Sequence, residues 1–280
     1  MEKAIITGAT DGIGREIAKE LAGRDYNLII HGRNREKAET VLATLKNINK
    51  NREYNIEIAD LESQLEIYQM AERIKASHEK IDILINNAGT YQKNYKYNQA
   101  GIEKTLAVNY HSHFILTLLL LKNIQKSNDP RIINVSSISH SSQLDINDIW
   151  NPTHYCAMKA YKDSKTALNL FTFKLAMLCK GRIMVNCLDP GIIDTKVLRR
   201  GWSLNGSPVE NGIITPVYLA DSEEVKGQTG NYYINKRKSK PASITYDREL
   251  QDQIWNKSIE MIKYQKIKTG IIRNIREQEY

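Results

Sequence analysis

The chain has 280 residues, a formal charge of +8 and 41% hydrophobic residues, and this length is ample for the core of a large α/β domain. Its longest apolar stretch is 118–121, or 114–121 if Thr117 is included. That is far short of the roughly 20 residues that cross a bilayer, so no membrane span is expected. Three cysteines without a C-x-x-C pair exclude a disulfide framework or a zinc ribbon. The N-terminus lacks the apolar stretch of a signal peptide, which predicts a cytoplasmic protein. Composition marks only the last few residues as a candidate for disorder.

The positive charge, with a pI near 9.2, fits nucleic acid, an acidic membrane surface, a polyanionic small ligand or simply a lysine-rich surface. Basic residues are scattered, and the one compact cluster is 236–238 with Lys240. A solvated turn is the favoured interpretation of this cluster. A nucleic-acid-binding protein is disfavoured because the chain has no basic stripe and no known binding motif. A phosphorylated cofactor would fit a positive field.

Short apolar, β-branched runs alternate with stretches of helical spacing from residue 3 onward. The runs predict strands at 4–7, 27–30, 54–58, 81–86, 131–136, 183–188 and 231–234. The spacing predicts helices at 14–22, 35–45, 65–76, 102–124, 157–178 and 246–264. Parallel strands need such crossover connections, so we expect an α/β fold with a Rossmann-type, doubly wound parallel sheet of about seven strands and helices on both faces.

We expect a single domain over residues 1–280, because the chain has no long Pro/Gly/Ser linker and no internal repeat. Residues 1–235 are predicted to form its core, and 236–280 a C-terminal extension with one packed helix. Two connections, 138–154 and 191–230, interrupt the alternation directly after strand ends. Ligands of open parallel sheets bind at the carboxyl ends of the strands, so these connections are the predicted substrate loops.

A glycine-rich turn follows the first strand, with the sequence Gly8-Ala9-Thr10-Asp11-Gly12-Ile13-Gly14. Glycines let the backbone turn tightly and approach a pyrophosphate that rests on a helix N-terminus. A mere tight turn between strand and helix is the competing interpretation. Its position at the very start of the alternating pattern favours a dinucleotide site.

The second strand ends in His31-Gly32-Arg33-Asn34, without the acid that typically binds the adenosine ribose of NAD. The Arg33 guanidinium suits a 2′-phosphate instead, so NADP(H) is the predicted cofactor. A solvent-exposed charge is the alternative for Arg33. Asp60-Leu61 ends the third strand and is predicted to accept a hydrogen bond from the adenine amino group, although a helix cap explains Asp60 almost as well.

Tyr161 and Lys165 lie four residues apart at the start of an apolar helix, and therefore on one helical face. An ammonium near a phenol lowers the phenol pKa from about 10 and suits it to proton transfer. A serine hydroxyl from 136–137, at the end of the fifth strand, would hold the substrate oxygen. A tyrosine and a lysine that merely share a helix face are the alternative.

Tyr155 and Lys159 repeat the same spacing. The helical apolar pattern, however, continues from Tyr161, whereas Tyr155 follows Pro152 in what reads as the end of a loop. We therefore reject this pair as catalytic and expect it to border the substrate pocket.

The chain resembles the short-chain dehydrogenase/reductase family over about residues 3–235. The motifs that carry the resemblance occur in the family's order: Thr7-Gly8-x-x-x-Gly12-x-Gly14, Asn87-Ala88-Gly89, Ser137, Tyr161-x-x-x-Lys165 and Pro190-Gly191. Within the family it resembles the retinol-dehydrogenase-like branch, through 131–137 with His140, 160–165, 170–172 and 230–233.

The resemblance implies an NADP(H)-dependent hydride transfer between a carbonyl and an alcohol. It implies that Tyr161 is the general acid/base, that Lys165 binds the nicotinamide ribose and lowers the Tyr161 pKa, and that Ser137 orients the substrate carbonyl. Asn109 would support a proton-relay water. The family's spacing from Lys to Pro-Gly also favours Lys165 over Lys159.

The nucleotide contacts that the motifs and the resemblance imply are Gly8, Thr10, Asp11, Gly12, Ile13, Gly14, Arg33, Asn34, Asp60, Leu61, Asn87, Ala88, Gly89, Tyr161, Lys165, Pro190, Gly191, Ile193 and Thr195. Of these, Thr195 would contact the nicotinamide carboxamide or the pyrophosphate.

Two departures from the branch argue against assuming a retinoid substrate: Asp189 stands before Pro190 where the branch often has His, and no N-terminal membrane anchor is expected. A small to medium hydrophobic carbonyl or alcohol is the expected substrate. The tyrosines of 91–97 suit an aromatic pocket or, more simply, a solvated loop. His111 and His113 point to different sides of a helix, so no metal site is expected.

Residues 116–121 read as core or subunit-interface helix. In the family, this helix and the helix that carries Tyr161 commonly form dimer interfaces, which implies a homodimer or homotetramer. The competing function is a non-catalytic NADP-binding regulatory protein of the same fold, which the intact Ser137, Tyr161 and Lys165 argue against.

Overall fold

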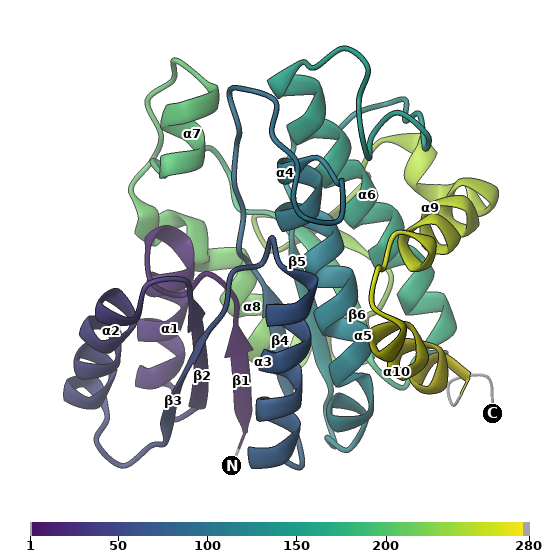
Figure 1. Ribbon diagram of the computed structural model, residues 1–280. Coiled ribbons are helices and arrows are strands. Elements are labelled where there is room, and N and C mark those ends of the chain that lie inside the picture. Colours follow the sequence, from purple (N-terminus) through teal and green to yellow (C-terminus); the bar gives the residue numbers. More distant parts are fainter. Residues whose placement is uncertain (1, 277–280) are drawn as a thin grey trace.

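The computed structural model describes residues 2–276, which form a layered α/β fold around one sheet (Figure 1). The eight strands lie in the order β3-β2-β1-β4-β5-β6-β7-β8. All neighbours pair in parallel except β7 and β8. The strands are β1 (Lys3–Ile6), β2 (Asn27–Gly32), β3 (Tyr54–Ile58), β4 (Ile83–Asn86), β5 (Arg131–Val135), β6 (Met184–Asp189), β7 (Tyr232–Ile234) and β8 (Arg237–Ser239). The predicted doubly wound sheet is thus confirmed, with β8 as an additional strand. The last few residues, predicted as a candidate for disorder, include 277–280, which lie outside the described residues.

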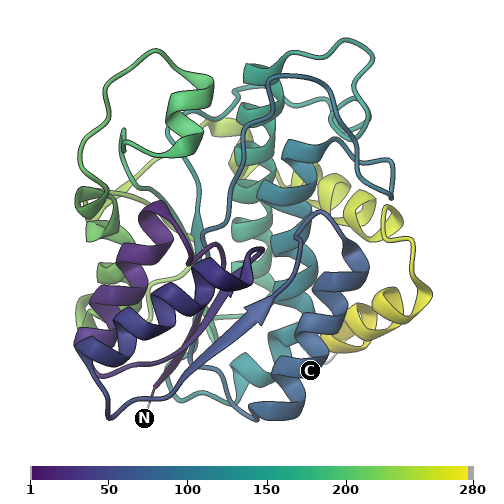
Figure 2. The same cartoon turned by 60° about the vertical axis from the view of Figure 1, so that its left-hand side comes forward.

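The helices cover both faces of the sheet (Figures 1 and 2). They are α1 (Gly12–Gly23), α2 (Arg35–Ile48), α3 (Gln64–Ser77), α4 (Lys104–Leu106), α5 (Ser112–Gln125), α6 (Ala157–Leu178), α7 (Lys196–Gly201), α8 (Ile214–Asp221), α9 (Arg248–Glu260) and α10 (Gln265–Arg276). Short 3-10 turns occupy η2 (Val209–Ile213), η3 (Glu223–Val225) and η4 (Ser243–Tyr246).

Two hydrophobic cores lie on opposite faces of the sheet. Ile5 and Ile29 face the core with α3, α5 and α6, while Ile6 and Ile30 face the core with α1, α2 and α8. Alternate residues of one strand point to opposite faces, so a parallel strand covered on both faces needs a continuous apolar run. This requirement explains why apolar runs in the sequence predict the strands.

The predicted helix 102–124 begins at Lys104 and is interrupted by the π-helical turn η1 (Ala107–His111) before α5. Such turns insert one extra residue and frequently occur at functional sites. In α5 every residue is buried except Lys122 and Gln125, which are half-buried. The helix α5 packs against α3 and α10 of its own chain, so the surface of 116–121 is already covered. Residues 116–121 are therefore core, and the subunit interface that the resemblance implies for them is not available on this surface.

The helix predicted for 246–264 is present as α9, but the expectation of one packed helix in the extension is wrong, because α10 follows it, and both lie on the α5 and α6 side (Figure 1). Trp255 of α9 packs on the rings of Phe114 and Phe171, with centroid distances of 5.2 Å and 5.9 Å. In α10, the Asn274 side chain donates to the Leu118 carbonyl at 2.8 Å. The extension therefore shields an apolar surface of α5 and α6 that would otherwise face water.

The basic cluster near residue 237 lies in the β7–β8 hairpin. Asn235 and Lys236 have positive φ angles of 48° and 64°, as the turn of a two-residue hairpin requires. Arg237 and Lys238 of β8 are exposed. The interpretation as a solvated turn is confirmed at 235–236, and the adjoining basic residues form an edge strand.

In the described part of the chain, 2–276, no helix is long and apolar enough to span a membrane.

The docking of the C-terminal extension predicts a large loss of stability in Trp255→Ala. Truncating a buried aromatic side chain costs about 3–5 kcal/mol, and urea denaturation would measure the free energy of unfolding. Tyr246→Ala serves as the control. Like Trp255, Tyr246 contacts a ring of α6, that of Phe173, but it is 46% exposed, so its truncation should cost less stability. Equal stability of the two variants would contradict a docked extension.

Candidate active site

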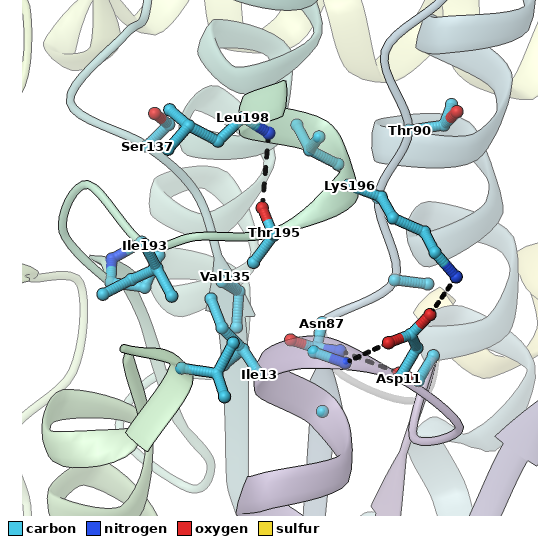
Figure 3. A pocket seen from close by; sticks show the side chains of 18 of the residues that line it. Asp11, Ile13, Asn87, Thr90, Val135, Ser137, Ile193, Thr195, Lys196 and Leu198 are labelled. Atoms are coloured by element: carbon cyan, nitrogen blue, oxygen red, sulfur yellow. Dashed lines mark hydrogen bonds and ion pairs between the residues drawn. The ribbon is translucent and has the colours of Figure 1, made fainter. Parts of the chain in front are cut away.

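A pocket of about 830 Å³ opens at the carboxyl ends of the strands. Its walls come from the glycine-rich turn, the ends of β2 to β6 and the 191–210 connection. Figure 3 shows side chains of the glycine-rich turn, of the segments that end β4 and β5 and of the 191–210 connection around one opening. All nineteen residues predicted to contact the nucleotide line this pocket, as do the predicted catalytic residues except Asn109.

The glycine-rich turn is built for close approach. Gly8 has a φ of 67°, a conformation that favours glycine. A Cβ on Gly14 would collide with the Asn87 side chain and the Gly8 carbonyl. The Asn87 amide donates to the Thr7 carbonyl at 2.9 Å, and Asp11 caps α1 by accepting from the Gly12 N–H at 2.9 Å. The turn therefore presents backbone at the start of α1, as an anionic phosphate needs.

His31 supports the glycine-rich turn through a hydrogen bond, a role that the sequence analysis did not predict. Its Nδ1 accepts from the Gly8 N–H at 3.2 Å, which leaves Nε2–H to donate to the Ala59 carbonyl at 3.0 Å. Burial lowers the pKa of His31 to about 4, so the ring is neutral near pH 7. No spacing in the sequence marks this contact, because it joins the ends of three strands.

At the adenosine end, Arg33 is 65% exposed and lies 3.9 Å from Asp60 and 3.6 Å from Glu62. Asn34 caps α2 by accepting from the Lys37 N–H at 2.9 Å. Lys37 also lines the pocket. Two cations and two carboxylates thus surround the position where a 2′-phosphate is predicted. The Arg33 guanidinium is free to turn because its contacts are long and solvated.

At the other end of the pocket, Tyr161 and Lys165 extend from α6 as the spacing predicts. The Lys165 ammonium lies 5.8 Å from the centroid of the Tyr161 ring and donates to the Val135 carbonyl at 2.8 Å. The Ser137 side chain lies close enough to the Tyr161 hydroxyl to affect its pKa. The structure therefore brings three of the four predicted catalytic side chains together at the end of β5.

The pKa of Tyr161 is raised in this structure, whereas the sequence predicts that it is lowered. Burial raises the pKa of Tyr161 to about 12, while the Ser137 side chain lowers it and the Asp189 charge raises it further. Burial also lowers the pKa of Lys165 to about 8. The expectation considered only the attraction between ammonium and phenolate, whereas the loss of hydration weighs more in this enclosed place.

Asn109 lies behind the pocket wall, in the π-helical turn. Its Oδ1 accepts from the Thr90 N–H at 2.7 Å, and its Nδ2 donates to the Thr90 carbonyl at 3.0 Å and to the Ser164 hydroxyl at 3.1 Å. Its side chain therefore fixes the segment after β4 against α6 and does not line the pocket.

The outer part of the pocket is apolar. Ile138, Ile192 and Leu204 line it and are each more than half exposed, at 58%, 51% and 53%. Trp202 stands edge-on to Tyr161, with a centroid distance of 5.1 Å. Tyr91 packs against both rings, at 5.9 Å and 5.4 Å. The solvated-loop interpretation of 91–97 is thus wrong for Tyr91, which is buried, while Tyr95 and Tyr97 are exposed.

The second tyrosine–lysine pair lies elsewhere. Tyr155 donates to the Gln92 carbonyl at 2.6 Å, and Lys159 pairs with Asp163 at 2.7 Å. Neither residue lines the large pocket; both border a small cavity beside α6. The expectation that this pair borders the substrate pocket is therefore wrong.

An ion pair connects the glycine-rich turn with the segment that follows β6. Lys196, in the first turn of α7, reaches Asp11 of the glycine-rich turn (Figure 3). Thr195 caps α7 by accepting from the Leu198 N–H at 3.3 Å. The 191–201 segment thus lies over the turn predicted to hold the pyrophosphate.

Within residues 2–276 no group of three or more His, Cys, Asp or Glu side chains could hold a metal ion. His111 hydrogen-bonds through Nε2 to the Ser258 carbonyl at 2.9 Å. Burial lowers the pKa of His113 to about 3, and the Lys165 charge adds to this effect.

Comparison with known proteins identifies the family. Residues 2–203 match the family model described as short chain dehydrogenase. Human polyprenol dehydrogenase is 35% identical, with 92% of this chain and 84% of the relative covered. Human retinol dehydrogenase 13 is 33% identical, with 92% and 83% covered. The solved Pseudomonas aeruginosa RhlG/NADP active-site complex is similar at a TM-score of 0.67 and 25% identity, with 82% and 93% covered. The chain therefore belongs to the short-chain dehydrogenase/reductase family, in its retinol-dehydrogenase-like branch, and is an NAD(P)-dependent oxidoreductase of CH–OH and C=O groups.

Proposed function

We propose that the protein transfers a hydride between NADP(H) and an apolar aldehyde, ketone or alcohol, with Tyr161 as the general acid/base. The observation that carries this proposal is that Ser137, Tyr161 and Lys165 line the same pocket as the glycine-rich turn. Hydride transfer with a dinucleotide needs a proton donor and a cation near the substrate, and a backbone site for the phosphates. Tyr161 and Lys165 provide the first two, and the glycine-rich turn of the same pocket provides the third.

The residues present fit a dinucleotide. Side chains are excluded at Gly8 and Gly14, where the backbone must be bare, and the capped start of α1 offers N–H groups to a pyrophosphate. Arg33, Asn34 and Lys37 would hold the 2′-phosphate, Asp60 and Leu61 the adenine, and 87–89 with 190–195 the nicotinamide half. When bound, the nicotinamide supplies or accepts the hydride.

The chain's own groups would then move the proton. In reduction, the Tyr161 hydroxyl donates its proton to the carbonyl oxygen, and the Ser137 hydroxyl donates a hydrogen bond to the same oxygen. In oxidation, the Tyr161 phenolate accepts the alcohol proton. Lys165 stabilises the phenolate and would bind the nicotinamide ribose, while Asn109 positions the Thr90 segment beside them. The raised pKa of Tyr161 favours the protonated form, which suits carbonyl reduction.

An apolar substrate is supported by the rim of the pocket. Ile138 belongs to the proposed substrate loop 138–154, and Ile192 and Leu204 belong to the proposed loop 191–230. Two of the similar proteins are named for polyprenol and retinol, which are apolar alcohols. We propose a hydrophobic carbonyl or alcohol as the substrate class.

The cytoplasmic location, the homodimer or homotetramer and the division into a 1–235 core with a 236–280 extension stay predictions. An interface between copies would have to use a surface other than α5, which is covered within the chain. Cell fractionation, light scattering and limited proteolysis would test the three.

Tyr161→Phe separates the enzyme from a non-catalytic NADP-binding protein. Removing the proton donor should lower kcat for aldehyde reduction by about 10²-fold or more, with NADPH binding retained. Tyr155→Phe is the matched control, since Tyr155 has the same spacing to a lysine but lies outside the pocket, and its turnover should stay close to that of the wild type. Unchanged turnover in Tyr161→Phe would refute the proposed role.

Arg33→Ala tests the choice of NADP(H). Without the guanidinium, Asp60 and Glu62 would face the 2′-phosphate with negative charge. NADPH affinity should therefore fall about tenfold or more, while NADH affinity is kept, as measured by nucleotide fluorescence. Arg35→Ala is the control, because the Arg35 side chain at the start of α2 is 68% exposed and pairs with Glu39. Equal wild-type affinity for NADPH and NADH would contradict the predicted role of Arg33.

A further inference from the structure

Asp189, the last residue of β6, joins the two segments that flank the catalytic pocket. One carboxylate oxygen, Oδ1, accepts from the Ile138 N–H at 2.8 Å. The other, Oδ2, accepts from the Gly191 N–H at 3.1 Å. Each oxygen thus serves a different segment, the connection after β5 and the turn after β6. Of the acidic residues that line the pocket in the described chain, Asp189 alone is buried.

The segment that Asp189 holds carries Ser137. On the other side of Ser137, the His140 Nδ1 lies 2.8 Å from the Ser137 carbonyl. The His140 Nε2 accepts from the Ala242 N–H at 2.8 Å, which leaves Nδ1–H to donate to that carbonyl. The serine is therefore fixed between β6 and the C-terminal extension.

Four titratable groups surround the Asp189 carboxyl: Lys165 of α6, Tyr161 of α6, His140 and Tyr232 of β7. Burial raises the pKa of Asp189, whereas its two backbone hydrogen bonds and the charge of Lys165 lower it.

In return, the Asp189 charge raises the pKa of Lys165, which burial lowers to about 8, and raises that of Tyr161. From α5, His113 faces Lys165 as well.

We propose that Asp189 is a positioning residue of this oxidoreductase: its two carboxylate oxygens fix the segment that carries Ser137 against the Pro190–Gly191 turn, and its buried negative charge is the counter-charge of the Lys165 ammonium. The role rests on the proposed function, because it acts through Ser137 and Lys165. An uncharged side chain supplies no counter-charge, and a carboxamide offers one acceptor oxygen where the two N–H groups now have one oxygen each.

Asp189→Asn keeps the size of the side chain and removes the charge and one acceptor. We expect kcat for carbonyl reduction to fall about tenfold and the loss of activity at alkaline pH to move to lower pH. Removing a negative charge lowers the pKa of both Tyr161 and Lys165, so both shifts have the same sign.

Asp163→Asn is the matched control. Asp163 is a buried carboxylate of α6 that accepts from the Ser141 hydroxyl at 2.5 Å and so holds the same connection. It lies outside the pocket. If Asp189 only braced the fold, both variants would lose stability and keep the wild-type pH profile, and that result would overturn the proposal.

A titration that needs no turnover separates this inference from the proposed function. In protein with ¹³Cε-labelled lysine, the Lys165 signal is identified by its loss in Lys165→Arg, and it should titrate near pH 8, apart from ordinary lysines near about 10.4. Asp189→Asn should move this titration to lower pH, and an unmoved titration overturns the proposal. Asp189→His, also without the negative charge, replaces Asn if that variant does not fold. A moved titration in a protein that reduces no carbonyl would support the charge pairing and refute the proposed function.

Discussion

The hydroxyl of Thr7 holds together the two halves of the sheet where the site opens. It accepts from the N–H groups of Asn87 and Ala88 at 2.9 Å and 3.0 Å, which ties the end of β1 to the end of β4. At this place the strand order reverses, so the crossovers on either side leave in opposite directions and a crevice remains. The glycine turn, the Asn87 bond to its backbone and the pocket above them all depend on this junction, since a wider gap would move the turn away from β4.

The parts of the fold and site that depend on local sequence were predictable. Buried parallel strands require apolar runs, the glycine turn requires bare backbone, and Tyr161 and Lys165 share one helical turn. The parts that were not predicted depend on segments far apart in the sequence: the Tyr91 ring packs on the Trp202 ring, His31 links three strand ends, and no sequence periodicity indicates either contact. Burial also reversed the direction expected for the Tyr161 pKa, because a sequence shows which charges are neighbours but not how much water they lose.

The C-terminal extension completes the core on the α5 side. Tyr110 and Ser258 bond through their hydroxyls at 2.5 Å, Trp255 covers Phe114, and α10 lies along α5 closely enough that a Cβ on Gly270 would be 3.4 Å from Leu119. Through the His140 contact with Ala242 the same extension reaches the connection that carries Ser137. The C-terminal extension therefore contributes both to the core and to the position of Ser137, although it lies far from Ser137 in the sequence.

The short strand β8 has a consequence for the behaviour of the protein at high concentration. It is the last strand on its side of the sheet, and an exposed edge strand offers unpaired backbone groups to a neighbouring molecule. Three residues provide few such groups, and the exposed Arg237 and Lys238 bring like charges together when two such edges meet. This edge is thus protected against growth into a shared sheet, and replacing its cations with β-branched apolar residues would remove that protection while leaving the pocket untouched.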